Sequence, residues 1–181
     1  METKRLTLLS ILLALSVVIN IVERIVMAAV TTTVPFLMPF LGAGGLRLGI
    51  ANVVVLTVLY LYGKRDAFAV LFLRVFLVAL GTGTLLGVPF FTGLVGGALA
   101  YTAMITFKRL PGFSIISVSV TGAIGHVVGQ ILVAMVIVGP FVIFYFPLMF
   151  LISIPAGYLV GRLAERMIAI VSPVVSRENH W

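Results

Sequence analysis

The sequence predicts an all-α integral membrane protein, a six-helix bundle, and this prediction rests on composition and on the length of the apolar segments. Of the 181 residues, 62% are hydrophobic and only 9% are charged. A soluble domain usually has about a quarter of its residues charged, which this chain cannot supply. The segments between charges are long enough to cross a bilayer, which takes roughly 20 apolar residues as a helix. We therefore expect a single transmembrane domain over residues 1–181.

Charge pairs and clusters of proline and glycine divide the chain into six predicted spans. Their ranges are 6–27, 45–62, 66–82, 89–107, 113–138 and 146–168. The first follows a basic start, as in a signal peptide, but no small-residue cleavage site follows it, so we interpret it as a retained helix. Between the first two spans, Pro35, Pro39 and three glycines predict a structured hydrophobic loop.

The basic residues alternate from loop to loop, which predicts the orientation. One set of helix ends carries Lys4, Arg5, Lys64, Arg65, Lys108, Arg109, Arg162, Arg166 and Arg177. The alternate loops, around 28–44, 83–88 and 139–145, contain no lysine or arginine. By the positive-inside rule, we expect a multi-pass protein of the cell membrane with both termini in the cytoplasm. The net charge of +7 then reflects topology and attraction to anionic lipids, and not nucleic-acid binding.

Polar residues inside the predicted spans mark a candidate substrate site, because they are costly in a membrane. Most lie in the predicted outer half, and the set is Asn20, Glu23, Arg47, Asn52, Arg74, His126 and Gln130. Arg47 is expected to open the second helix, and Arg74 lies about 13 Å along the third, near mid-membrane. Because arginines outnumber the one acid, Glu23, we expect a substrate with a carboxylate or phosphate and an apolar or aromatic body.

Each of these residues also has a structural interpretation, which the sequence leaves open. Asn20, Asn52 and Gln130 can be hydrogen-bond partners between helices, worth about 0.6 kcal/mol each. His126 can be a core histidine with satisfied hydrogen bonds. Arg47 can extend to the outer lipid head groups.

Small residues at four-residue spacing predict where helices meet. Gly125 and Gly129, and Gly157 and Gly161, are typical of close helix packing within the chain. Ser10 and Ala14 have the same spacing near the cytoplasmic end of the first helix, on a face turned away from the polar stripe. We expect this pair to face a second protein.

Several kinds of chemistry are missing from the sequence. There is no cysteine, so disulfides, thiolate catalysis and cysteine-based zinc sites are excluded. No nucleotide-binding P-loop and no Ser/His/Asp set is present. Asp66 is the only aspartate, so an aspartate-rich magnesium–diphosphate site cannot form. We predict no enzyme activity, no catalytic residue, no metal and no cofactor, with energy supplied by a partner.

Three stretches in this order resemble the Gx transporter family, which is also labelled heptaprenyl diphosphate synthase component I. They are "GGLRLGIANVVVLTVLYLYG", "LRVFLVALGTGT" and "SVSVTGAIGHVVGQILVA". The resemblance covers nearly all of residues 5–168, and that family is similar to the S components of energy-coupling-factor (ECF) vitamin transporters. It implies a six-helix S-component fold with a site open to the outside, beneath the loops after helices one, three and five.

The same resemblance implies docking through the first helix onto a transmembrane coupling subunit that binds two ATPase subunits. S components often have Ala-x-x-x-Ala there, where this chain has Ser10 and Ala14. The predicted function is therefore the substrate-binding subunit of an ECF-type importer. The alternatives are an accessory membrane component of prenyl diphosphate or quinone biosynthesis, or a scaffold in an electron-transfer or lipid-handling assembly.

Overall fold

The computed structural model describes residues 2–33 and 47–178, and within these ranges the chain is helical with no strand. The helices are α1 (Glu2–Thr33), α2 (Asn52–Leu61), α3 (Lys64–Gly81), α4 (Val88–Lys108), α5 (Ile115–Ile137) and α6 (Phe146–Glu178), with a short 3-10 helix, η3 (Pro140–Tyr145), before α6. Over residues 2–33 and 47–178, the predicted all-α class and the six predicted helices are confirmed.

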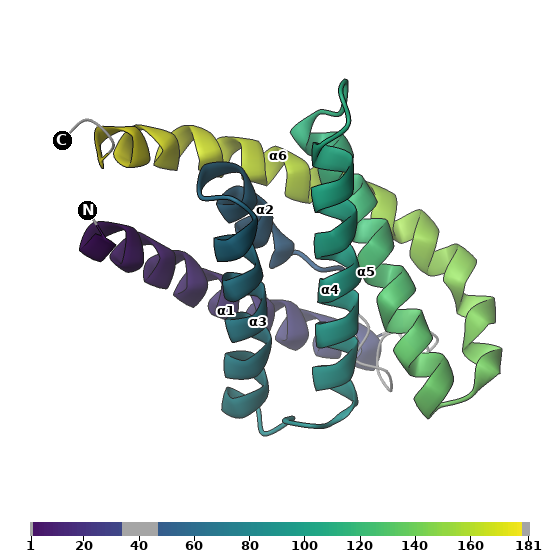
Figure 1. Ribbon diagram of the computed structural model, residues 1–181. Helices are drawn as coiled ribbons and strands as arrows, with labels where there is room; N and C mark the ends of the chain where they lie inside the picture. The colour runs from purple at the N-terminus through teal and green to yellow at the C-terminus, as the bar shows by residue number, and fades with distance from the viewer. Residues whose placement is uncertain (1, 34–46, 179–181) are drawn as a thin grey trace.

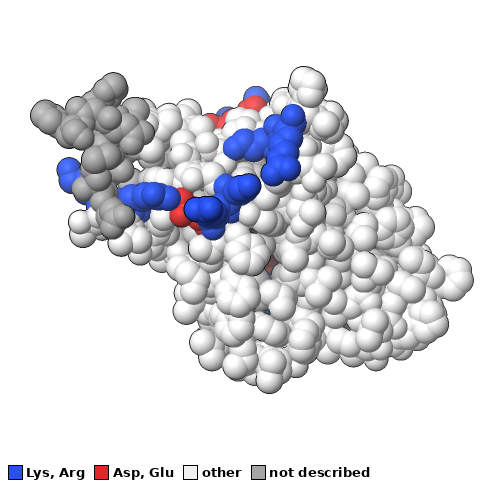
Figure 2. Space-filling view, in the orientation of Figure 1, with Lys and Arg blue, Asp and Glu red and all other residues white. Residues whose placement is uncertain are grey.

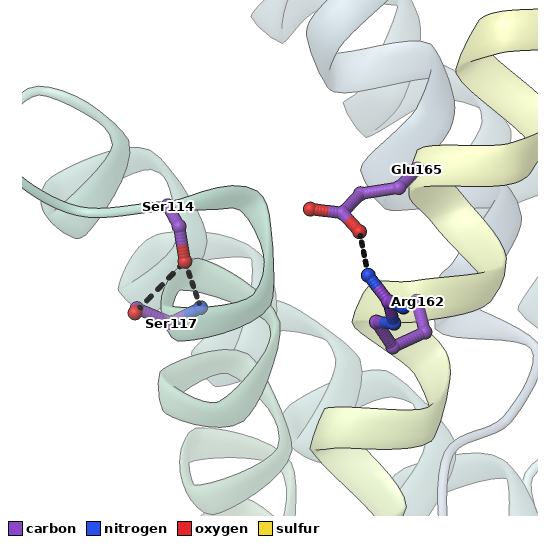
Figure 3. A network of polar contacts seen from close by, with 4 residues as sticks. All are labelled: Ser114, Ser117, Arg162 and Glu165. Carbon is purple, nitrogen blue, oxygen red and sulfur yellow. Dashed lines mark hydrogen bonds and ion pairs between the residues drawn. The ribbon is translucent and has the colours of Figure 1, made fainter.

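α3, α4 and α5 lie within two residues of their predicted bounds, but α1 and α6 are longer than predicted. α1 covers 2–33 and not 6–27, because residues 28–33 contain no proline or glycine that would end it. α6 continues from 146 to 178, past the predicted end at 168, because its charged residues do not end a helix. On α6 Arg162 pairs with Glu165 one turn later at 3.2 Å (Figure 3). The loop prediction at Pro35 and Pro39 lies outside the described residues.

The second predicted span, 45–62, is wrong at its start. Residues 47–51 form an irregular segment, and α2 begins only at Asn52. Gly49 has φ +78°, a conformation that side-chain-bearing residues rarely adopt and that interrupts helical geometry. Arg47 therefore lies in the segment before α2 and does not open the helix. α2 has 10 residues, about 15 Å of rise, and eight of them are buried.

Four helical segments in the described residues are long and apolar enough to cross a membrane. They are Thr3–Val30, Val88–Lys108, Ile115–Ile137 and Pro140–Val175. The predicted spans 45–62 and 66–82 do not reach this standard. α2 is too short, and α3 carries three charged residues at its start besides Arg74.

Figure 1 shows α3 and α4 antiparallel to each other, with α1 and α6 running across them. α5 packs on α4 and on α6, and these are the two most extensive helix contacts. Glycines make the first of them close, because a Cβ on Gly129 would lie 2.6 Å from the Cα of Gly96. The buried α2 packs against α1, α3 and α6.

One end of the bundle carries most of the exposed charge. Figure 2 shows lysine and arginine gathered in the upper part of the molecule, where α3 begins and α4 ends in Figure 1. There Arg5 pairs with Asp66 at 2.5 Å, which links α1 to α3. α5 begins near this end, and its N-cap residue is Ser114, whose side chain accepts a hydrogen bond from the Ser117 N–H at 3.2 Å (Figure 3). The grouping agrees with the charge alternation read from the sequence.

Candidate binding site

The structure brings together all seven polar residues predicted from the sequence. Each is at most 9% exposed: Asn20, Glu23, Arg47, Asn52, Arg74, His126 and Gln130. All except Gln130 line a single pocket among α1, the segment 47–51, α2, α3, α4 and α5. Arg74 is ten residues, about 15 Å, along α3 from Lys64, so the pocket lies well away from the basic end.

Arg47 is held by three helices. Its Nη1 donates to Oδ1 of Asn20 at 2.8 Å, and its Nη2 donates to the carbonyl of Pro89 at 2.7 Å. The Gln130 amide is oriented so that its oxygen accepts from the Arg47 N–H at 3.1 Å and its nitrogen donates to the Arg47 carbonyl at 3.2 Å. That oxygen also accepts from Nε2 of His126 at 3.1 Å. Asn20 and Gln130 therefore act first as groups that position Arg47.

The segment 47–51 is also tied to α1. Oε1 of Glu23 accepts a hydrogen bond from the Gly49 N–H at 2.8 Å, and the Ser16 hydroxyl donates to the Ala51 carbonyl at 3.4 Å. Gly49 is favoured here by its positive φ, and an added Cβ would also make a tight contact, 3.1 Å, with the His126 side chain. These contacts fix the only carboxylate among the described residues of the pocket.

Three polar atoms on the pocket residues are buried without a hydrogen-bond partner in the described part of the chain. They are Oε2 of Glu23 and Nε and Nη1 of Arg74. Arg74 is 2% exposed, and its Nη2 donates to Oδ1 of Asn52 at 3.0 Å. Leaving such an atom unpaired costs about 1–3 kcal/mol, so three of them in one pocket make it the candidate binding site.

The loop between α3 and α4, residues 82–87, borders the pocket. Nη1 of Arg24 donates to the Thr82 hydroxyl at 3.0 Å and lies 3.4 Å from the Thr84 hydroxyl. The unfilled volume inside the pocket is about 20 Å³, which is room for about one water molecule. A larger guest therefore requires the side chains or this loop to move.

An apolar groove adjoins the polar pocket along α1. Its unfilled volume is about 220 Å³, and it is lined by Val18, Ile19, Val22, Glu23, Val26, Met27 and Ile50. Glu23 is thus part of the wall of both spaces. Neither this groove, nor the Pro89 carbonyl, nor the contacts of Arg24 were predicted from the sequence. In the sequence, the groove is indicated only by a stripe of apolar residues on α1. The position of a backbone carbonyl, such as that of Pro89, has no sequence signal.

No three His, Asp or Glu side chains in the described ranges are placed to hold a metal ion. Ser10 and Ala14 are exposed on α1 and are not among the residues that line the pocket.

The fold and the pocket define an all-helical bundle of apolar helices with an internal, arginine-containing polar site. Residues 12–167 match the family described as heptaprenyl diphosphate synthase component I, and the chain belongs to this family. The match includes every residue of the candidate site, and it confirms the family indicated by the sequence motifs. No curated protein and no solved structure matches the chain.

Proposed function

We propose that this chain is an integral membrane protein that serves as the substrate-binding subunit of an ECF-type importer. The observation that carries the proposal is the buried Arg74, which keeps two donor atoms without partners in a pocket inside apolar helices. A guanidinium with free donors suits a carboxylate or phosphate through charge-assisted hydrogen bonds. The substrate is a small anion with a vitamin-like or amphipathic body.

The distribution of charge supports capture from outside. The basic end in Figure 2 corresponds to the cytoplasmic end under the positive-inside rule, which places both termini in the cytoplasm of the cell. The pocket lies in the other half of the bundle, next to the loop 82–87. Opening this loop admits the substrate, and the contacts of Arg24 with Thr82 and Thr84 form again when it closes.

The partner in this proposal is a transmembrane coupling subunit with its ATPase subunits. The chain has no P-loop of its own, so ATP hydrolysis belongs to the partner. Ser10 and Ala14 lie on an exposed face of α1 with Leu6, Ile11 and Leu15, which are 40–61% exposed. Small residues on an apolar face let another helix approach closely.

The proposal is tested by coexpression with candidate coupling and ATPase subunits from the same genome. We expect a stable complex after gentle solubilisation, and native mass spectrometry of the solitary chain is expected to show a retained small molecule. Uptake of that molecule should require the ATPase subunits. The absence of any complex with every coupling subunit of the genome would refute the importer role.

The proposed topology predicts which positions an impermeant thiol reagent reaches from outside. The chain has no cysteine, so single cysteines report without background. Cysteines replacing Thr32, Leu85 and Phe141, which are exposed at the end away from the basic residues, should be labelled in intact cells. Cysteines replacing Arg65 and Arg109 should be labelled only after permeabilisation. The reverse pattern would rule out capture from outside.

The docking surface predicts a selective loss of assembly. Replacing Ser10 or Ala14 with tryptophan should reduce copurification with the coupling subunit about tenfold or more, because the larger side chain fills the space for a partner helix. Retained small molecule in the solitary variant should equal wild type. Thr102→Trp, on an exposed face of α4, is the matched control. Equal loss in all three variants would mean that bulk on any lipid-facing surface disturbs the assembly.

The family's description supports a second candidate, an accessory membrane role in prenyl diphosphate synthesis. The single aspartate means that this chain supplies no aspartate-rich magnesium site, so a separate catalytic subunit does the chemistry. A prenyltransferase assay with and without the purified chain decides this. Stimulation of the partner's turnover by the chain would favour this role over import.

A further inference from the structure

The unpaired atoms of the pocket differ in kind, and this difference restricts what can bind. Nε and Nη1 of Arg74 can only donate hydrogen bonds, so they require an acceptor. Oε2 of Glu23, as a carboxylate oxygen, can only accept, so it requires a donor. A simple anion satisfies Arg74 but leaves Glu23 unpaired and is repelled by its charge.

The charged side chains of the pocket also favour a ligand that carries both a hydrogen-bond acceptor and a donor. Arg47 and Arg74 both interact electrostatically with Glu23. Arg47 already uses both of its terminal nitrogens on Asn20 and Pro89. Arg74 and Glu23 thus remain as an opposite pair with free hydrogen-bonding positions, which is complementary to a molecule that carries an acceptor and a donor close together.

Glu23 also lines the apolar groove, which indicates where the rest of the bound ligand lies. The groove is lined by apolar side chains of α1 and by Ile50, and it is about ten times larger in unfilled volume than the polar pocket, 220 Å³ against 20 Å³. A donor that reaches Oε2 of Glu23 is therefore next to space for an apolar group. Removing such a group from water favours binding there.

We infer that the pocket takes a small acid with a hydrogen-bond donor, an amine or a hydroxyl, beside its anionic group and with an apolar side chain. Arg74 binds the anionic group, Glu23 accepts from the donor, and the groove along α1 holds the side chain. This inference rests on the proposed function and specifies its substrate class.

Three probes that differ only in the donor test the inference on the full chain in lipid nanodiscs. Leucine, 2-hydroxy-4-methylpentanoate and 4-methylpentanoate share a carboxylate and an isobutyl group, and carry an ammonium, a hydroxyl or a hydrogen at the second carbon. Titration calorimetry should show the first two binding about tenfold or more tighter than the third, as expected for a hydrogen bond to a charged group.

Variants assign the preference to Glu23. Glu23→Gln should reduce the difference between leucine and 4-methylpentanoate to about threefold or less, because the charged acceptor is removed. Glu165→Gln, an identical change on the exposed face of α6, should keep the wild-type ratio. Val22→Trp fills the groove and should weaken all three probes by a similar factor, with the ratio kept. The ratio is read within one folded variant, so a loss of stability does not mimic the result.

Equal affinity for the three probes in the wild type would overturn the inference and leave the anion-binding importer intact. Failure of the wild type to bind any of them would also overturn it. The importer role is then judged separately, by the complex with the coupling subunit. If the ratio of the affinities for leucine and 4-methylpentanoate is the same in Glu23→Gln as in the wild type, the assignment of the donor to Glu23 is overturned.

Discussion

Gly129→Ala is expected to lower the free energy of unfolding by about 3 kcal/mol, at the upper end of the usual range for overpacking. The added Cβ would lie 2.6 Å from the Cα of Gly96, and 2.8 Å from both the nitrogen of Gly96 and the carbonyl oxygen of Val95. All three are backbone atoms of α4, so no side-chain rotation relieves the contact. The two helices must separate along their interface.

Thermal unfolding in one fixed detergent measures this effect. A loss of 3 kcal/mol corresponds to a melting temperature about 6–12 °C lower for a chain of this length. Gly81→Ala is the matched control, because Gly81 is helical and nothing lies within 4 Å of its added Cβ. The control should melt at or above the wild-type temperature, since alanine favours a helix over glycine by about 1 kcal/mol. A Gly129→Ala protein that melts like the control would show that α4 and α5 are not packed this closely.

The close helix contacts could be predicted from the sequence because their signal is local. Glycines four residues apart fall on the same face of a helix, whatever the rest of the chain does. The predicted packing is confirmed on both sides of α5. A Cβ on Gly125 would lie 2.9 Å from the Leu99 carbonyl of α4, and one on Gly157 of α6 would lie 2.8 Å from the Cα of Val120.

The second helix shows why hydropathy alone did not place the elements. Residues 45–62 are apolar enough to form a span, and the irregular segment 47–51 was read as helix. Long-range contacts hold this segment in a non-helical conformation. Glu23 accepts from the Gly49 N–H, and Gln130 bonds the backbone of Arg47. These partners come from α1 and α5, so no local pattern reveals them.

The burial and grouping of the seven polar residues could be predicted from the sequence, whereas the hydrogen bonds that each of them makes could not. Polar residues in apolar helices are costly, so each of the seven needs a polar partner. Six of them bond another member of the set, and Glu23 accepts from the Gly49 N–H. Which atoms are used inside the protein depends on the three-dimensional arrangement. Gln130 was predicted as a substrate-binding residue, but its amide bonds Arg47 and His126. Arg74 was predicted in the same set, and its Nη2 donates to Oδ1 of Asn52.

Arg74→Met is expected to weaken binding of leucine and of 4-methylpentanoate alike, by about tenfold to a hundredfold, and to stabilise the protein in the absence of either. The loss of affinity follows from removing a charge-assisted hydrogen bond to the carboxylate that both probes share. The gain in stability follows from the environment of Arg74. Its side chain is 2% exposed, two of its nitrogens are unpaired in the described residues, and Arg47 repels it.

Glu23 keeps Arg47 as an opposite charge in this variant, so no carboxylate is left alone. Replacing buried ionised groups with apolar side chains of similar volume is often stabilising, by about 1–4 kcal/mol, provided that no unpaired charge remains. A net gain of 1 kcal/mol, after the loss of the Asn52 contact, raises the melting temperature by about 2–4 °C. Arg65→Met, at the exposed start of α3, is the matched control and should change neither quantity appreciably. If Arg74 served the fold instead of a ligand, its methionine variant would melt lower and bind normally. Arg74→Met is expected to raise the melting temperature and to weaken probe binding. This combination is typical of a residue that serves substrate binding, because functional sites retain groups that the folded protein alone does not need.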